Sequence, residues 1–201
     1  MVEYSFVIPV YNEQDNIHTL QKEITEVIQQ IRSSFEIIWV DDGSTDKSAE
    51  VIGTVLDNAA INSRLIRFDH NYGQSAALSA GFQRATGRFV ITLDSDLQND
   101  PADILKMIPL LNQYDMVTGW RRIRNDCLWK KLSSKFANYI RNRLSRESIR
   151  DTGCSMKIMK MSYLQRVKMF QGAHRFLPTL MKMEGARVVE VPVTHRPRLK
   201  G

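Results

Sequence analysis

The feature that most constrains the fold is an alternation, over residues 1–120, of short apolar runs with segments of helical periodicity. Five apolar runs are typical of strands: Ser5–Val10, Phe35–Val40, Arg64–Phe68, Arg88–Leu93 and Asp115–Trp120. Apolar residues recur at helical spacing from Ile17 to Ile31, and Ala76–Ala85 is rich in helix formers. Apolar strands separated by helices predict βαβ units on a parallel sheet that helices cover on both faces.

The pattern changes after residue 120. We predict one helix over Asp126–Ser145, because its apolar residues recur every four positions (Leu128, Leu132, Phe136, Ile140 and Leu144). A strand over Ser155–Met159, a helix around Phe176–Met183 and a strand over Ala186–Val193 follow. There is no internal repeat, low-complexity linker or second domain boundary, so we expect a single α/β domain.

Polar clusters follow three of the predicted strands. They are Tyr11-Asn12-Glu13, Asp41-Asp42-Gly43-Ser44 and Asp94-Ser95-Asp96. In open α/β sheets, ligands bind at the carboxyl ends of the strands. The three clusters therefore predict a functional site at one edge of the sheet.

Asp94 and Asp96 are the strongest single feature. Residues i and i+2 of an extended chain project to the same side, so the two carboxylates should converge. Like charges side by side are unfavourable unless a cation joins them, and hard oxygen ligands suit Mg²⁺ or Mn²⁺ bridging a diphosphate. Gln98 is placed to supply a third oxygen. The alternative is an ordinary surface turn, in which aspartate is common.

The second cluster also reads as a strand–turn–helix junction. Gly43 permits a tight turn, and Ser44 or Thr45 can cap the next helix. That reading leaves Asp41 and Asp42 unexplained, and a carboxylate there can accept from a base N–H or a ribose hydroxyl. Neither a P-loop nor a G-x-G-x-x-G motif is present, which argues against a P-loop NTPase and a dinucleotide-binding unit.

The composition excludes several classes of protein. Hydrophobic residues make up 43% and charged residues 25% of the chain, as in soluble globular domains. Cys127 and Cys154 form neither a disulfide framework nor a C-x-x-C pair, so we expect a reducing, cytosolic compartment. No basic segment precedes the first apolar run, and no stretch approaches the roughly 18 apolar residues of a membrane span. We therefore expect no signal peptide and no bilayer crossing in these residues.

Basic residues are concentrated in one segment. Residues 121–168 hold 14 Lys and Arg against three acidic residues, although the whole chain carries only +6. Such a block indicates a polyanionic partner: nucleic acid, an anionic membrane surface or phosphorylated substrates. Charge alone does not choose among them.

Seven short segments together resemble a known family. Four are Pro9-Val10-Tyr11-Asn12-Glu13, Val40-Asp41-Asp42-Gly43-Ser44-Thr45-Asp46, Asn71-Tyr72-Gly73-Gln74 and Asp94-Ser95-Asp96-Leu97-Gln98-Asn99-Asp100-Pro101. Their order and spacing resemble glycosyltransferase family 2, which has the GT-A fold. Three more resemble the branch of dolichol-phosphate mannose synthases and polyprenyl-phosphate glycosyltransferases: Asp151-Thr152-Gly153-Cys154-Ser155-Met156-Lys157, His174-Arg175-Phe176-Leu177-Pro178 and Val191-Pro192-Val193-Thr194-His195-Arg196-Pro197-Arg198.

The resemblance implies an inverting transferase that moves a sugar from a UDP- or GDP-sugar to a polyprenyl phosphate, in cell-envelope glycan synthesis. It implies a Rossmann-like, mostly parallel sheet with a nucleotide-sugar half (1–120) and an acceptor half (121–201). The expected setting is the cytoplasmic membrane face, with transmembrane helices beyond Gly201 and no nucleic-acid partner.

The resemblance also assigns roles to individual residues. The nucleotide-sugar would contact Pro9, Tyr11, Glu13, Asp41, Asp42, Asp94 and Asp96. Asp94, Asp96 and Gln98 would hold Mg²⁺ or Mn²⁺. Asp96 and Arg121 would be the catalytic groups, and Arg121, Lys130 and Ser134 would bind the acceptor phosphate. The family commonly has Arg at the position of Lys130, so bidentate phosphate binding is lost there.

The chemistry of the residues agrees with this reading. Lys130 and Ser134 are i, i+4 neighbours and share one helix face, although a solvated lysine and an ordinary surface serine would give the same pattern. A phosphate monoester is already largely ionised at neutral pH, so it needs cations rather than a general base. A sugar hydroxyl acceptor would need a base, for which Asp151 is the nearest candidate. A third reading is a non-catalytic basic module that binds a membrane or nucleic acid. We expect structural roles for most of the four histidines and for Cys154.

Overall fold

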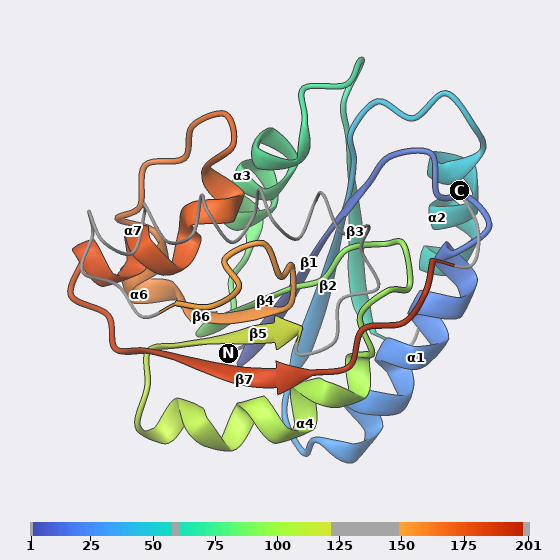
Figure 1. Ribbon diagram of the computed structural model, residues 1–201. Helices are drawn as coiled ribbons and strands as arrows, with labels where there is room; N and C mark the ends of the chain where they lie inside the picture. The colour runs from blue at the N-terminus through green and yellow to red at the C-terminus, as the bar shows by residue number, and fades with distance from the viewer. Residues whose placement is uncertain (1, 58–60, 122–148, 199–201) are drawn as a thin grey trace.

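The computed structural model describes residues 2–57, 61–121 and 149–198, which form a seven-stranded sheet flanked by helices (Figure 1). The strands are β1 (Tyr4–Val10), β2 (Phe35–Asp41), β3 (Asn62–Arg67), β4 (Phe89–Thr92), β5 (Met116–Arg121), β6 (Lys157–Lys160) and β7 (Val188–Val193). The α-helices are α1 (Ile17–Gln30), α2 (Ser48–Asp57), α3 (Gln74–Arg84), α4 (Ile104–Met107), α6 (Met161–Leu164) and α7 (Leu177–Met183). Short 3₁₀ turns flank α4 and precede α7 (Pro101–Asp103, Ile108–Asn112 and Ala173–Phe176).

The strand order is β3-β2-β1-β4-β6-β5-β7. β1 pairs in parallel with β2 and β4, β2 with β3, and β5 with β7. β6 lies between β4 and β5 and is antiparallel to both. The prediction of a mostly parallel sheet is therefore confirmed, with one strand of opposite direction among the described residues.

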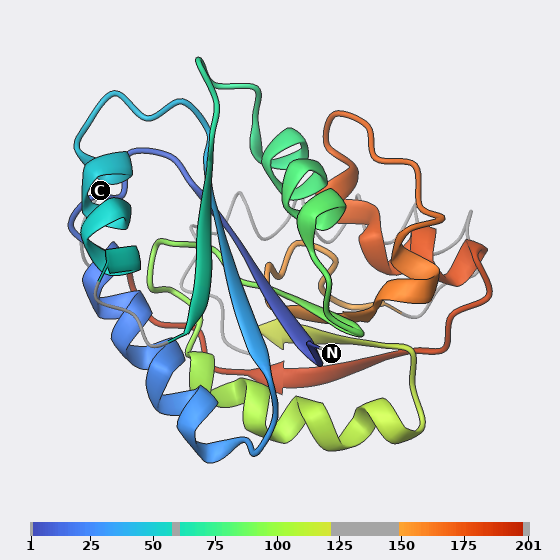
Figure 2. The ribbon, with the colours of Figure 1, turned by 180° about the vertical axis from the view of Figure 1, so that it is seen from behind.

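Successive strand residues point to opposite faces, and each face is covered by its own helices. On one face Phe6, Ile8 and Trp39 pack with apolar residues of α1, α2 and α4. On the other face Val7 and Ile38 pack with α3, α6 and α7. Figure 2, seen from behind, shows α3 on the opposite side of the sheet from α1. Both faces are buried, as the near-continuous apolar strands predict.

The predicted strand positions agree with the structure to within two residues at each end, and α1, α3 and α7 lie where helical periodicity placed them. One local prediction was wrong. Neither Ser44 nor Thr45 caps α2; instead the Asp46 carboxylate accepts from the Ser48 backbone N–H at 2.9 Å. Ser44 Oγ accepts from the Asn12 backbone N–H and so holds a different loop. The predicted helix Asp126–Ser145 lies outside the described residues.

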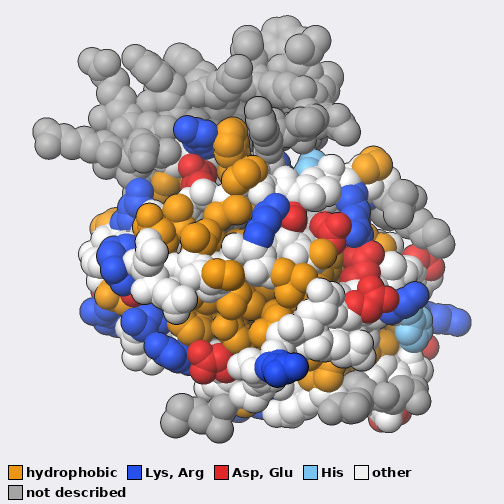
Figure 3. All heavy atoms as spheres, turned by 90° about the horizontal axis from the view of Figure 1, so that it is seen from below, with side chains coloured by type: hydrophobic (Ala, Val, Ile, Leu, Met, Phe, Trp, Pro, Cys, Tyr) orange, Lys and Arg blue, Asp and Glu red, His pale blue; other side chains and the backbone are white. Residues whose placement is uncertain are grey.

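The far edge of the sheet is β7. It pairs only with β5 among the described residues, and its Pro192 is tolerated because an edge strand leaves one side unpaired. Figure 3 views the side on which α4 and β7 lie in Figure 1, and hydrophobic side chains gather there between Lys and Arg side chains. In the described part of the chain, no helix has the length and apolarity that a membrane crossing requires.

Candidate functional site

A cavity opens where β1 and β4 separate. β4 pairs with β1 only as far as Val7, and Pro9, which has no N–H to pair, lies beyond this point. The strand order continues from β1 to β2 on one side and to β4 on the other, so this is the switch point at which open α/β sheets bind ligands. The cavity has a volume of about 460 Å³ and is lined by Pro9, Val10, Tyr11, Glu13, Asp42, Asn71, Gly73, Gln74, Asp94, Ser95 and Asp96. All three predicted polar clusters contribute to it.

The β1–α1 turn forms the first wall of the cavity. Asn12 has a φ of 55°, a left-handed conformation that asparagine tolerates better than most residues. Its Oδ1 accepts from the Thr45 backbone N–H at 2.8 Å, and Ser48 Oγ accepts from the Glu13 backbone N–H at 2.9 Å. These bonds tie the end of β1 to the loop after β2. Tyr11, 46% exposed, is left at the mouth of the cavity.

Glu13 is a buried carboxyl in this wall. It accepts from the Asn16 amide and from the Arg198 guanidinium, the latter at 2.6 Å. Burial raises the pKa of Glu13; the bond from Asn16 and the charge of Arg198 lower it, while Asp96 adds to the rise. The chain near Arg198 therefore lies against the β1–α1 turn, where Arg198 contacts Glu13 of the cavity wall.

Asp41 and Asp42 are neighbours in the sequence, but their carboxylates have different hydrogen-bond partners. Asp41 is fully buried, and its Oδ1 accepts from the Ser44 backbone N–H at 3.1 Å. Its Oδ2 lies 3.6 Å from Arg67 Nε and accepts no hydrogen bond from any described residue. Asp41 does not line the cavity, whereas Asp42 does.

The Asp42 carboxylate holds the loop that leads into α3. It accepts from the backbone N–H groups of Tyr72 at 2.8 Å and of Gly73 at 2.9 Å. Gly73 has a φ of 91°, which glycine adopts without strain. Burial raises the pKa of Asp42, and the two backbone bonds oppose that rise. Asp42 thereby positions Gln74, which follows directly.

Asp94 and Asp96 both face the cavity, as predicted. Gln74 Nε2 donates to Asp94 Oδ1 at 2.6 Å, and the Gln98 backbone N–H donates to Asp96 Oδ1 at 3.1 Å. Burial, and then the charge of Asp96, raise the pKa of Asp94 to about 6. A carboxylate whose ionisation its neighbour disfavours belongs to a donor set that a divalent cation stabilises. The residues therefore fit Mg²⁺ or Mn²⁺, with a ligand supplying further oxygens.

Gln98 is oriented differently from its two partners. Its Nε2 lies 3.5 Å from the Arg196 carbonyl oxygen, and it does not line the cavity. Within the described ranges, no three His, Cys, Asp or Glu side chains form a metal-ligand cluster. The structure thus brings two of the three predicted metal ligands together in the cavity.

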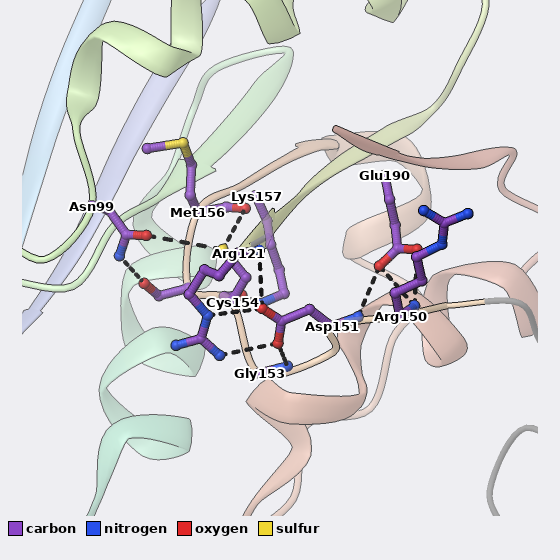
Figure 4. A network of polar contacts seen from close by, with 10 residues as sticks. Asn99, Arg121, Arg150, Asp151, Gly153, Cys154, Met156, Lys157 and Glu190 are labelled. Atoms are coloured by element: carbon purple, nitrogen blue, oxygen red, sulfur yellow. Dashed lines mark hydrogen bonds and ion pairs between the residues drawn. The ribbon is translucent and has the colours of Figure 1, made fainter. Parts of the chain in front are cut away.

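Arg121, at the end of β5, is held by a buried carboxylate (Figure 4). Asp151 accepts from Arg121 Nε at 2.8 Å and from Nη2 at 3.0 Å, a bidentate pair. The side chains of Arg121 and Asp151 are 16% and 5% exposed. Asp151 also accepts from the backbone N–H groups of Arg121 and Gly153. The carboxylate is thus used to orient Arg121, in a pair that charge and geometry both strengthen.

Several residues at the site did not stand out in the sequence. Lys157, His174 and Arg175 line a second, smaller cavity that shares Gln74 and Asp94 with the first. The sequence signal existed, because each of these residues belongs to one of the seven segments, but nothing in it placed them together. Cys154 is buried as predicted, and burial raises the pKa of its thiol. Lys130 and Ser134 lie outside the described residues.

Comparison with known proteins gives the family. Residues 5–168 match the family described as Glycosyl transferase family 2. The chain belongs to this family. A curated member that it resembles is the dodecaprenyl-phosphate galacturonate synthase of Rhizobium johnstonii, 35% identical over all of this chain and 61% of that protein. Another is the undecaprenyl-phosphate 4-deoxy-4-formamido-L-arabinose transferase of Pectobacterium carotovorum, 36% identical over 96% of this chain and 60% of that protein. The chain thus spans about three fifths of these relatives.

Solved structures of glycosyltransferases share the fold. The glucosyl-3-phosphoglycerate synthase of Mycobacterium tuberculosis, in complex with Mn²⁺ and UDP-glucose, aligns with a TM-score of 0.71 at 17% identity, over 98% of this chain and 72% of that chain. The same enzyme has also been solved with Mg²⁺ and UDP. The likeness establishes the GT-A fold for this chain.

Proposed function

We propose that this chain is the catalytic domain of an inverting glycosyltransferase that moves a sugar from a nucleoside diphosphate-sugar to a polyprenyl phosphate. The observation that carries the proposal is the convergence of Asp94 and Asp96 on a cavity at the β1/β4 switch point. Family membership and the names of the two curated relatives support it, since both name a polyprenyl phosphate.

On the donor side, Asp94 and Asp96 would hold Mg²⁺ or Mn²⁺, with Gln98 as a third ligand if its side chain turns toward them. A divalent ion there neutralises the diphosphate and stabilises the charge that develops on the leaving nucleotide. Pro9, Tyr11, Glu13 and Asp42 would form the nucleotide-sugar pocket. The family resemblance also assigns Asp41 to the base; because its side chain is buried and does not line the cavity, this contact would require the loop after β2 to move.

On the acceptor side, a phosphate oxygen would attack the anomeric carbon as the bond from that carbon to the diphosphate oxygen breaks. The nucleoside diphosphate leaves with the electron pair, and the configuration inverts. The phosphate is already ionised, so it needs only cations that hold it in place. Arg121 would supply one cation, and Lys130 and Ser134 would complete the phosphate site.

The Arg121–Asp151 pair favours this acceptor over a sugar hydroxyl. A hydroxyl acceptor needs a general base within hydrogen-bond reach of its proton. The obvious base, Asp151, already accepts from two guanidinium nitrogens and two backbone N–H groups. A carboxylate so engaged is a poor proton acceptor, because each of these bonds stabilises its charged form.

The basic segment 121–168 would face anionic lipid headgroups at the cytoplasmic membrane face, where a polyprenyl phosphate resides. Each basic residue near such a surface contributes about 1 kcal/mol, and the effect fades within a Debye length of roughly 10 Å at 0.1 M salt. A nucleic-acid partner is not part of the proposal, because it would leave Asp94 and Asp96 without a role.

The test combines ligand binding with one substitution. Mn²⁺ with the correct nucleoside diphosphate, UDP or GDP, should stabilise the protein by about 2.7 kcal/mol at 100 times Kd. For a chain of this size that is a rise in Tm of about 5–10 °C. Asp96→Asn should abolish both this rise and sugar transfer while the protein remains folded. Near wild-type transfer by Asp96→Asn would show that the metal site is misassigned.

The acceptor site is tested separately. Lys130→Ala and Ser134→Ala should raise KM for the polyprenyl phosphate and leave KM for the nucleotide-sugar nearly unchanged. An effect confined to the donor would remove their acceptor role and favour transfer to a polysaccharide hydroxyl.

A further inference from the structure

A second cavity, of about 140 Å³, lies directly behind Asp94. Gln74 and Asp94 form the wall that it shares with the larger cavity, so the two adjoin at the carboxylate that faces both. On its other side, His174 and Arg175 separate it from a wider surface groove. The small cavity is therefore a compartment between the nucleotide end of the site and the open surface.

The position and lining of this compartment suit one sugar ring. A donor whose diphosphate lies at Asp94 and Asp96 would place its glycosyl group next to Asp94. The compartment offers apolar surface from Leu78, Leu93 and Leu177, and polar groups at a few points. This mixture is typical of a small-ligand site, in which apolar walls contact C–H faces and a few polar groups fix the orientation.

The polar groups that line the compartment are mainly cations and donors. Lys157 is only 3% exposed, and its ammonium donates to the Cys154 carbonyl. An ammonium has three N–H donors, so two remain, and no other described residue accepts from them. Arg175 lines the same compartment and forms no ion pair with any described residue. Two cations thus face one carboxylate, Asp94, which already accepts from Gln74.

The other nearby charges do not cancel this excess. Arg121 forms a bidentate pair with Asp151, and neither residue lines the compartment. Asp94 would in addition be engaged by the divalent ion. The carboxylates near Lys157 are Asp94 and Asp151, and a further anion in direct contact would stabilise so buried a cation. The compartment therefore lacks a negative charge that a ligand can supply.

His174 adds a neutral donor to the same wall. Ser75 Oγ accepts from the His174 backbone N–H at 3.3 Å and lies 2.7 Å from His174 Nδ1, so its hydroxyl proton is free to point at Nδ1. A ring whose Nδ1 accepts carries its proton on Nε2. Burial, and then the neighbouring Arg175, lower the pKa of His174 to about 4, so the ring is neutral at pH 7.

We propose that this compartment binds the transferred sugar and that Lys157 and Arg175 select a sugar carrying a carboxylate, that is, a uronic acid. This inference rests on the proposed function and specifies its donor. The carboxylate is attached to C5, which only the ring oxygen separates from the anomeric carbon, so the group would lie on the edge of the ring nearest the diphosphate and Asp94. Lys157 would meet it at the buried end, and His174 Nε2–H would donate to a ring substituent.

The competing source of negative charge is the acceptor phosphate. A polyprenyl chain needs an open path to the membrane, and the wide groove beyond His174 and Arg175, of about 690 Å³, is the more open space. The enclosed compartment, with Lys157 buried at its side, suits a terminal sugar ring rather than a phosphate that continues into a polyprenyl chain.

The experiment compares matched donors that differ only in a carboxylate or a hydroxymethyl group. The pairs are UDP-galacturonate with UDP-galactose, UDP-glucuronate with UDP-glucose, and GDP-mannuronate with GDP-mannose. Affinity is measured by calorimetry with Mn²⁺, and kcat/KM by transfer to a short polyprenyl phosphate. We expect the uronate of at least one pair to be favoured by about tenfold or more, as charge-assisted hydrogen bonds allow.

Variants assign the preference to the cations. Lys157→Met removes the charge and keeps most of the volume, so it should remove the preference, and Lys157→Arg should retain it. Lys22→Met is the control, because Lys22 is exposed on α1 and lies outside both the compartment and the basic segment. If Lys157→Met does not fold, Arg175→Gln, at an exposed position, should reduce the preference by itself.

Three outcomes overturn the inference. One is equal or weaker affinity for the uronate in every pair. Another is a uronate preference that Lys157→Met and Arg175→Gln both leave intact. The last is a loss in Lys157→Met that is equal for both donors and appears as a raised KM for polyprenyl phosphate, which would assign the cations to the acceptor. Absence of transfer from any nucleotide-sugar would instead contradict the proposed function.

Discussion

Replacing Asp151 with Asn tests whether this carboxylate positions Arg121 or acts as a base. The Asn side chain has nearly the same shape, but it would offer one acceptor and turn an N–H toward the guanidinium or the backbone. Asp151 is almost fully buried, and it accepts from Arg121 at 2.8 and 3.0 Å. Breaking a buried ion pair costs about 3–5 kcal/mol. Arg121 keeps some access to water, so we expect the lower end, about 3 kcal/mol.

That loss is large enough to measure. For a domain of this size, 1 kcal/mol corresponds to about 2–4 °C in Tm, so Asp151→Asn should melt about 6–12 °C below wild type. Transfer should fall and KM for the acceptor should rise, because Arg121 is no longer held. The pH profile of kcat/KM should keep its shape, since no proton transfer to Asp151 is involved.

Asp115→Asn is a matched control at the other end of β5. Asp115 is also buried and accepts from Arg187 Nε at 3.0 Å, but the Arg187 side chain is 64% exposed. Water can replace this bond, so we expect a loss of about 1 kcal/mol and unchanged transfer. The reasoning is refuted if Asp151→Asn is no less stable than Asp115→Asn, or if it removes one limb of the pH profile without lowering Tm.

Three further predictions follow from other parts of the structure. Protons compete with Mn²⁺ at Asp94, because burial raises the pKa of its carboxyl from 3.8 to about 6. Protonated Asp94 therefore stabilises the folded protein below pH 3.8, and this stabilisation is lost as pH rises through about 6. Mn²⁺ affinity, followed by calorimetry, should therefore weaken by up to about tenfold per unit below pH 6, and a flat profile from pH 7 to 5 would contradict this. Gly43→Ala should cost more than about 2 kcal/mol in urea unfolding, because Gly43 has a φ of 69° and its Cβ would lie 2.2 Å from the His70 carbonyl carbon. In contrast, Gly53→Ala in α2, where nothing lies within 4 Å, should stabilise by about 0.5–1 kcal/mol, and similar effects of the two would refute the steric argument. Finally, the chain should float with anionic but not neutral vesicles at low salt and release at high salt; binding to neither would mean that the basic segment serves substrate phosphates alone.

Much of the fold was determined by the sequence alone, since hydrophobic periodicity is a local property. Strands buried on both faces must be apolar throughout, and α1 must place apolar residues every three or four positions. Polar residues follow β1, β2 and β4, and they meet because the carboxyl ends of parallel strands lie at one edge of the sheet. The convergence of Glu13, Asp42 and Asp94 was therefore predictable before any coordinates.

The tertiary structure decided the features that depend on contacts between residues far apart in the sequence, such as the direction of β6 and the cap of α2. No local pattern shows that β6 runs antiparallel between β4 and β5, because an apolar strand pairs equally well in either direction. Asp46 caps α2, whereas Ser44 Oγ accepts a hydrogen bond from the backbone N–H of Asn12, 32 residues away. Contacts of this kind are selected by packing rather than by neighbouring residues.

The same reason explains what was missed at the site. Ser75 and His174 are 99 positions apart, yet their hydrogen bond fixes the ring that faces the small compartment. Lys157 reads in the sequence as one more cation in a basic segment, and only burial beside Asp94 gives it a specific role. Sequence thus supplied the chemical groups, and the fold decided which of them share a cavity, because burial and proximity depend on the whole chain.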